Sequence, residues 1–190
     1  RRTSLGLMAS GLLAGVGQQA QAAAPSGTFT IASHVTLPPA WLDPGEMPGL
    51  ATTQMVLYPV HDALVKPMRE GNPAPSLAKS YTASADGKTY EFVLRDGLTF
   101  HNGDPVTSDD IRFTFERYKG VSQKLLRDAV EKIETPDART AIFRLKDPWP
   151  DFMTFYALAS GANWIVPKKY IEKVGDAGFK KAPIGAGPYK

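Results

Sequence analysis

Residues 100–117, FHNGDPVTSDDIRFTFER, concentrate residue types that can bind a metal ion or transfer protons: one histidine, three aspartates and one glutamate. A catalytic zinc ion takes three protein ligands, often supplied by closely spaced pairs such as HxxxH. The histidines of the chain, His34, His61 and His101, form no such pair. The oxygen-rich run NGDPVTSDD also lacks the spaced acids and the final glutamate of a calcium-binding EF-hand loop. We therefore expect no metal and no cofactor.

The same residues fit a turn followed by the start of a helix. Asn102-Gly103 is a turn dipeptide, in which glycine can take a positive φ without strain. Thr107 is placed to cap a helix, and Asp110, three positions later, completes a capping box. Apolar residues follow at helical spacing and predict the buried face: Ile111, Phe115 and Tyr118. The pattern predicts that these acids shape the backbone and do not perform catalysis.

Other catalytic templates are missing from the sequence. It contains no GxSxG nucleophile elbow, no GxxxxGK phosphate loop and no GxGxxG dinucleotide motif. Two carboxylates could still converge in the fold as the acid–base pair of a glycoside hydrolase, although no pair stands out. A secreted hydrolase that uses acidic residues or His101 therefore stays open as an alternative function.

Composition excludes further classes of protein. The sequence has no cysteine, so it forms neither disulfides nor thiolate metal sites. The net charge of +3 includes Arg1 and Arg2. The remaining basic residues do not gather into the patch that nucleic-acid binding requires. We therefore expect no nucleic-acid partner.

The first residues have the features of an export signal. Arg1 and Arg2 precede LGLMASGLLAGVG, an apolar run shorter than the roughly 20 residues that span a membrane. Residues 20–22, Ala-Gln-Ala, give the small-x-small pattern of a signal-peptidase site. We assign residues 1–22 to a signal peptide of either the secretory or the twin-arginine type. Without a cysteine to carry a lipid, the protein is expected to be soluble in the periplasm.

Strands and helices are mixed along the rest of the chain. GTFTIASH alternates like a strand, and ATTQMVLYPVHDALV has the apolar spacing of a helix capped by Thr52 or Thr53. Two hairpins are predicted, with turns at Asp86-Gly87 and Pro136-Asp137. Their inward-facing residues are expected to be Tyr90, Phe92, Leu94, Ala141, Phe143 and Leu145.

The last third of the chain is expected to be mostly helical. A short aromatic helix is predicted after Pro150, and a longer one in IVPKKYIEKVG. The run APIGAGPYK is expected to bend and lead into a strand. Because strands and helices do not alternate regularly, the pattern favours an α+β or a mixed-sheet α/β fold.

The order of several motifs resembles the family 5 extracellular solute-binding proteins, which are the oligopeptide-, dipeptide- and nickel-binding components of ABC importers. The motifs are LDP, HDALV, PAPSLAKSYTASADGKTYEFVLRDGLTFHNGDPVTSDDIRFTFER and PIGAGPYK. The resemblance covers residues 28–190 and is most specific over residues 75–117. It implies a mixed-sheet α/β fold of the type II periplasmic-binding-protein kind, in which two lobes close on a ligand by a hinge motion.

The resemblance also implies a domain organisation. Residues 23–49 and 162–190 would belong to lobe I, and residues 50–161 would form a small α+β domain inserted into it. The second lobe would be missing, so the chain is expected to be an N-terminal fragment of a longer protein. A truncated remnant that binds nothing is a further alternative.

Candidate ligand contacts follow from the same resemblance. The loop after LDP matches a segment whose backbone touches ligand in peptide-binding relatives: Gly49, Leu50, Ala51 and Thr52. His34, at the end of the first strand, and Trp164, near the return into lobe I, are further candidates. The resemblance implies a monomeric, non-enzymatic protein that captures a peptide or similar small solute and delivers it to an ABC permease.

Overall fold

The computed structural model describes residues 42–46, 57–68, 71–158 and 161–190, which all fall within one compact unit. The predicted signal peptide, the strand predicted for GTFTIASH and residues 47–56 lie outside the described residues. In chain order the described elements are η1 (Pro44–Glu46), α2 (Tyr58–Val60), β1 (Val65–Met68), β2 (Gly71–Pro75), β3 (Ala78–Ala83), β4 (Thr89–Leu94), α3 (Ser108–Arg117), α4 (Gln123–Ala129), β5 (Val130–Glu134), β6 (Thr140–Leu145), η3 (Thr154–Leu158) and α5 (Lys168–Lys181).

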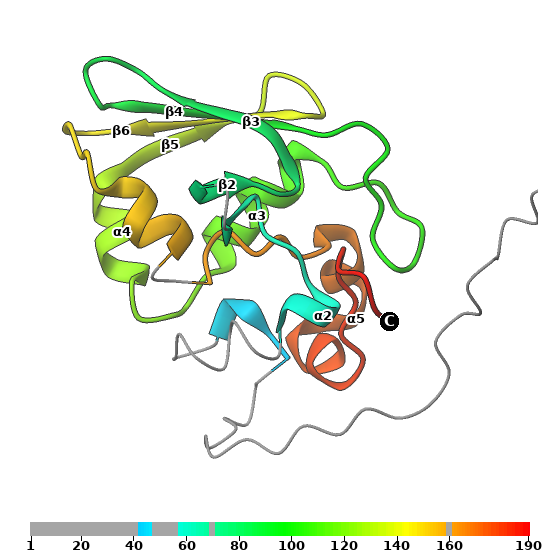
Figure 1. Cartoon of the computed structure of the whole chain (residues 1–190). Helices are drawn as coiled ribbons and strands as arrows, with labels where there is room; N and C mark the ends of the chain where they lie inside the picture. Colours follow the sequence, from blue (N-terminus) through cyan, green and yellow to red (C-terminus); the bar gives the residue numbers. More distant parts are fainter. Residues whose placement is uncertain (1–41, 47–56, 69–70, 159–160) are drawn as a thin grey trace, which may run out of the picture. The chain divides into compact units, whose positions relative to one another are not determined.

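A four-stranded antiparallel sheet with the strand order β3-β4-β6-β5 forms the largest regular element (Figure 1). Both predicted hairpins are confirmed, and Gly87 in the first turn has a φ of 67°. Strands β4 and β6 alternate between buried and half-buried residues. Their buried residues are those predicted from the sequence: Tyr90, Phe92, Leu94, Ala141, Phe143 and Leu145.

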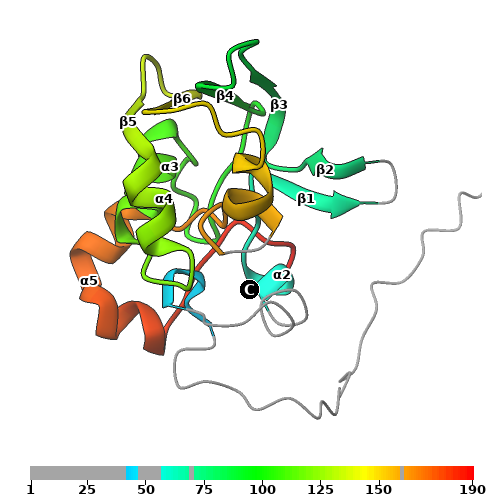
Figure 2. The ribbon, with the colours of Figure 1, turned by 90° about the vertical axis from the view of Figure 1, so that its left-hand side faces the viewer.

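Helix α3 packs on the buried face of this sheet, below β5 and β6 in Figure 2. The predicted capping box is present, because Asp110 Oδ2 accepts a hydrogen bond of 2.8 Å from the backbone N–H of Thr107. The predicted buried face is also confirmed, with Ile111, Phe115 and Tyr118 all less than 10% exposed. Between helix and sheet lies a cluster of aromatic rings: Phe92, Phe115, Phe143, Phe152 and Tyr156.

The helix predicted for ATTQMVLYPVHDALV is wrong at its C-terminal end. Among the described residues of that stretch, α2 ends at Val60, and His61 is already extended, with φ −112° and ψ 159°. Ala63 instead forms an isolated bridge with Trp164, and β1 begins at Val65. Ala63 and Leu64 are buried, as apolar spacing predicted, but a short apolar run is compatible with either a helix or a strand.

The hairpin of β1 and β2 was not predicted from the sequence. Its strands contain Pro67, Pro73 and Pro75, and proline lowers the expectation of a strand because it cannot donate a ladder hydrogen bond. The two strands form a separate two-stranded sheet, in which proline is tolerated at edge positions.

The helices after β6 agree in place with the sequence but differ in extent. The short aromatic segment is the π-helical turn η3, and α5 runs on to Lys181 across a break at Gly175, whose φ is 71°. Residues 182–190 contain no regular element, in agreement with the predicted bend, and the strand into which APIGAGPYK is expected to lead stays a prediction. These residues lie beside α2 through backbone hydrogen bonds from Gly187 to Val60 and from Tyr189 to Pro59.

Candidate functional site

The structure describes the residues on either side of the predicted ligand loop. His34 and the loop residues Gly49, Leu50, Ala51 and Thr52 lie outside the described residues, and their role stays a prediction. We call residues 42–46 and 57–61, which precede and follow the segment 47–56 in the sequence, the loop frame. Buried charged and polar side chains hold both parts of this frame.

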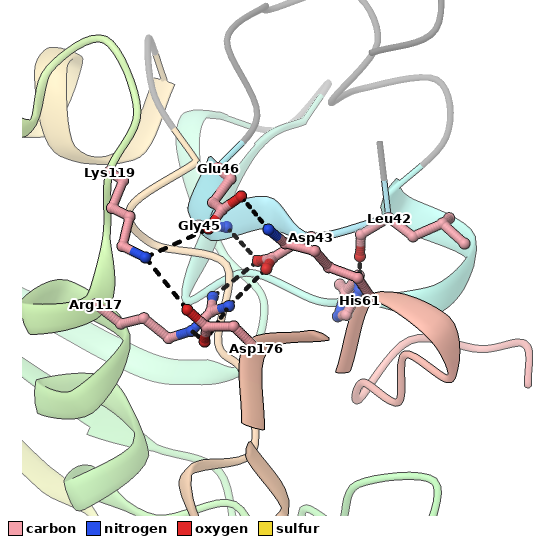
Figure 3. A network of polar contacts seen from close by, with 9 residues as sticks. Leu42, Asp43, Gly45, Glu46, His61, Arg117, Lys119 and Asp176 are labelled. Carbon is pink, nitrogen blue, oxygen red and sulfur yellow. Dashed lines mark hydrogen bonds and ion pairs between the residues drawn. The ribbon is translucent and has the colours of Figure 1, made fainter. Parts of the chain in front are cut away.

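The first part of the frame is held by an ion pair between Asp43 and Arg117, the last residue of α3 (Figure 3). The pair is bidentate, with Arg117 Nη1 2.8 Å from Asp43 Oδ1 and Nη2 2.5 Å from Oδ2. The Asp43 side chain is fully buried and that of Arg117 is 7% exposed. Asp43 Oδ1 also accepts the backbone N–H of Gly45 at 2.9 Å. Two buried charges are thus satisfied by matched geometry, as burial requires.

Arg117 makes further contacts with α5. Its Nε donates to Asp176 Oδ1 at 3.0 Å, and its guanidinium carbon lies 5.4 Å from the centre of the Phe179 ring. Burial on its own would lower the pKa of Arg117, but the hydrogen bonds and charges of Asp43 and Asp176 outweigh it and raise that pKa. Arg117 therefore stays cationic and joins three segments that are distant in the sequence.

Exposed ion pairs surround this buried pair. Lys119 Nζ lies 3.4 Å from Glu46 Oε1 and 3.2 Å from Asp176 Oδ2 (Figure 3). Lys180, in the last turn of α5, also pairs with Glu46. Such exposed pairs contribute little to stability individually, so we assign the positioning of the frame mainly to Asp43 and Arg117.

The second part of the frame is tied to the first by His61. Its imidazole is fully buried, and Nε2 donates to the backbone carbonyl of Leu42 at 2.9 Å (Figure 3). Burial, which disfavours the charged form, lowers the pKa of His61 to about 4 despite the opposing effects of Leu42 and Asp43. His61 is therefore neutral at physiological pH and carries its proton on Nε2.

Trp164 belongs to a small apolar cluster that includes residues of the second part of the frame. It is 2% exposed and packs with Leu57 and Ala63. The ring of Tyr58 lies 4.2 Å from the Trp164 ring, centre to centre, and the Lys66 ammonium lies 5.0 Å from the centre of the Tyr58 ring. Trp164 thus supports the second part of the frame through its contacts with Leu57 and Tyr58. Direct contact between Trp164 and ligand stays a prediction.

His101 is held by backbone groups. Its Nε2 lies 2.8 Å from the carbonyl oxygen of Gly187, and its Nδ1 accepts the N–H of Gly185 at 3.3 Å. In the same turn, Asp104 accepts a hydrogen bond from Asn102 at 2.7 Å. Among the described residues, no group of three histidine, aspartate or glutamate side chains is placed to hold a metal ion.

Sequence reasoning missed the residues that carry most of this architecture: Asp43, His61, Arg117 and Asp176. Asp43 was visible only as part of the LDP motif, and Arg117 only as the basic end of a helix. Arg117 lies 74 positions from Asp43 and 59 from Asp176, and His61 lies 19 from Leu42, so no local spacing indicates the contacts.

Comparison with solved structures places the fold of the chain among the solute-binding proteins of the periplasmic-binding-protein type. Over 80% of its length it superposes on OppA of Haemophilus influenzae in complex with the peptide RPPGFSPFR, with a TM-score of 0.67 and 28% identity. It also superposes over 80% of its length on AgaA of Agrobacterium tumefaciens in complex with agropinic acid, with a TM-score of 0.65 and 32% identity. The chain covers 33% and 30% of these two proteins.

Sequence comparison gives the particular family. Residues 72–190 match the bacterial extracellular solute-binding proteins, family 5, middle region, and the chain belongs to this family. It is 33% identical to the probable D,D-dipeptide-binding periplasmic protein of Escherichia coli and 29% identical to di/tripeptide-binding protein 2 of Pseudomonas aeruginosa. These alignments cover 70% and 90% of the chain but only 28% and 36% of the relatives.

The comparisons confirm the resemblance inferred from the sequence and the mixed α/β fold of the periplasmic-binding-protein type. The predicted domain boundaries at residues 49/50 and 161/162 stay predictions. None of the helices in the described ranges is both long and apolar enough to cross a membrane.

Proposed function

We propose that this chain is part of the solute-binding component of an ABC importer, exported to the periplasm. There it captures a peptide or a similar small solute between two lobes and delivers it to a membrane permease. The observation that carries the proposal is the family match over residues 72–190. The relatives support a peptide as the first ligand to test, because they include dipeptide- and di/tripeptide-binding proteins.

The proposed role needs no covalent chemistry. Solute binding shifts a two-lobed protein toward its closed state through contacts that only the closed state makes. The bonding of His101 argues against a hydrolase that uses this histidine, since both of its ring nitrogens contact backbone groups and neither is free to act as a base. We therefore propose a binding protein that is not an enzyme, and we expect it to act as a monomer, as the family resemblance implies.

The frame supplies a reason why the predicted loop residues could bind a solute reproducibly. A binding loop loses less entropy on binding when its two ends are fixed in advance. Residue 46 lies three positions before Gly49, and Leu57 lies five positions after Thr52. Asp43, Arg117 and His61 hold the described residues on both sides. We propose that the frame pre-organises Gly49, Leu50, Ala51 and Thr52, with His34 and Trp164 as further contributors.

A ligand screen on the full-length protein tests the proposal. The panel contains di- and tripeptides, the nonapeptide RPPGFSPFR, agropinic acid and nickel with L-histidine, the last three being ligands of solved relatives. A ligand present at 100 times its Kd stabilises the folded state by about 2.7 kcal/mol, which raises Tm by several degrees. We expect at least one peptide to give this shift.

Mass spectrometry of the recovered ligand separates binding from hydrolysis. An intact ligand after prolonged incubation supports the transport role. A cleaved ligand, together with loss of cleavage in His101→Ala, would support the hydrolase. If no compound in the panel shifts Tm although the protein unfolds cooperatively, the assignment to peptides and related solutes is wrong.

A further inference from the structure

The segment 183–189 is held against two distant parts of the chain by backbone contacts. The N–H groups of Gly187 and Tyr189 donate to the carbonyls of Val60 and Pro59 at 2.9 and 2.8 Å. On its other side, the N–H of His101 donates to the Gly185 carbonyl at 2.9 Å. Figure 1 shows this segment, in red, beside α2. We call it the return segment.

His101 binds the return segment with its ring in one protonation state only. Its Nε2 donates to the Gly187 carbonyl, and its Nδ1 accepts the Gly185 N–H. This arrangement requires a neutral imidazole with its proton on Nε2. A second proton, on Nδ1, would point at the Gly185 N–H, so that two donors would face each other.

The ring of His61 also lies close to Gly185. Its Nε2 is bonded to Leu42, which leaves Nδ1 without a proton, and this buried Nδ1 has no hydrogen-bond partner. A Cβ atom built on Gly185 would lie 2.6 Å from His61 Nδ1 and 2.2 Å from the Val60 carbonyl oxygen. Gly185 therefore packs closely against His61 and Val60, with no room for a side chain. A proton added to His61 Nδ1 would have no acceptor among the described residues.

The charges near His61 do not compensate for such a proton. The charged and titratable side chains that act on His61 are Asp43, which is already paired with Arg117, and His101. Asp62, next in the sequence, is bound to Lys66 and to Ser76. From α5, the ring of Phe179 faces His61 at 6.0 Å between centres. Protonation of His61 would therefore leave a buried cation beside the Phe179 ring, and the neighbouring carboxylates already have other partners.

We propose that His61 and His101 form an acid-sensitive latch: both neutral imidazoles lie against Gly185, and protonation of either one releases the return segment. The inference goes beyond solute binding and does not depend on which solute the protein takes. Release frees the backbone of Pro59 and Val60, so acid would loosen the second part of the loop frame. The low pKa of about 4 for His61 agrees with a neutral ring in the closed latch.

Hydrogen exchange at different pH values tests the latch in the full-length protein. Exchange is followed by mass spectrometry between pH 7.5 and 4.5 and corrected for the intrinsic pH dependence of amide exchange. Peptides that cover residues 183–190 should lose protection by up to about tenfold per pH unit below pH 6.5, as expected for one proton taken up on opening. Peptides from β4 and β6 should keep their protection over the same range.

Four variants show which side chain causes the effect. His101→Gln keeps an N–H donor for Gly187 but cannot be protonated, and His61→Gln does the same for Leu42, so each should reduce the pH dependence and the double variant should remove it. Asp104→Asn is the matched control, because it removes a titrating group from the same turn and should leave the response unchanged. Equal protection of residues 183–190 at pH 7 and pH 4.5 would overturn the latch, as would an unchanged response in the double variant.

A spectroscopic measurement keeps the proposal testable if the His61 variant does not fold. In protein with isotope-labelled histidine, nitrogen NMR distinguishes the two neutral tautomers and the charged form. We expect both rings to be neutral with the proton on Nε2 at pH 7. A proton on Nδ1 of either ring at that pH would contradict the proposal.

Discussion

The four-stranded sheet and the loop frame are stabilised by different kinds of contact. The sheet is held by aromatic and aliphatic side chains, with Phe92 and Phe143 fully buried at its centre. The frame is held by a buried ion pair, a neutral buried histidine and backbone hydrogen bonds. The stabilisation from apolar burial is non-directional and does not depend on pH. The stabilisation from buried charged groups depends on both their geometry and their protonation. The sheet is thus suited to act as a scaffold, and the frame to respond to its surroundings.

The largest effect is expected from removing a central ring of the sheet. Phe143 is fully buried and contacts the rings of Phe92, Phe115, Phe152 and Tyr156. Phe143→Ala should lower the free energy of unfolding by about 4–5 kcal/mol, because a large cavity replaces the ring. Urea unfolding at pH 7.5 and at pH 5.5 should give the same loss. A loss that depends on pH would break the distinction between the two regions.

A slightly smaller loss is expected when the ion pair of the frame is broken. Arg117→Met leaves Asp43 buried without its partner, which should lower the free energy of unfolding by about 3–4 kcal/mol. Replacing both residues, as Asp43→Leu with Arg117→Met, should lose less than the sum of the single changes, because no charge is then left unpaired. Urea unfolding of the four proteins measures this coupling.

The same variants separate positioning from stability. If the frame pre-organises the predicted loop, the double variant should bind solute more weakly than the wild type even where its stability is restored. Arg112→Met, in the same helix but in an exposed pair with Asp109, is the matched control and should change neither stability nor affinity appreciably. Unchanged affinity in the double variant would show that the frame has no positioning role.

Acid should act on the frame through His61. Its pKa is about 4 in the folded protein and 6.5 ordinarily, so between these values the unfolded chain takes up a proton that the folded protein does not. The stability contributed by the neutral ring is fully present above pH 6.5 and is lost as pH falls toward 4. The wild type should lose on the order of 3 kcal/mol relative to His61→Gln over this range. Urea unfolding at half-unit pH steps measures the difference, and parallel curves would contradict it.

How much could be predicted from the sequence also differs between the two regions. The hairpins around Asp86-Gly87 and Pro136-Asp137 and the start of α3 depend on contacts a few positions apart, so alternation and turn residues were sufficient. By contrast, Asp43 of the frame and its partner Arg117 are 74 positions apart, and His101 and Gly187 of the return segment are 86 apart. No residue spacing indicates such pairs, and the family resemblance supplied the place of the frame but not its contacts.

The smallest expected effect lies where the two regions meet, at the N-terminus of α3. Asp110 Oδ2 accepts the Thr107 N–H and hydroxyl within the capping box, while its Oδ1 accepts the backbone N–H of Lys168, at the start of α5, at 2.9 Å. Thr107→Ala should lower the free energy of unfolding by about 1 kcal/mol, since it removes only the local hydroxyl. Serine restores that hydroxyl, so Thr107→Ser should be close to the wild type.

Asp110 should respond to acid in the direction opposite to His61. Burial raises its pKa, although hydrogen bonds from Thr107 and Lys168 oppose the shift. The folded protein therefore takes up this proton more readily than the unfolded chain, and its contribution to stability increases as pH falls toward the ordinary value of 3.8. Comparing Asp110→Asn with His61→Gln by urea unfolding at pH 7 and pH 4.5 should give changes of opposite sign. Changes of the same sign would mean that acid acts on the scaffold and the frame alike.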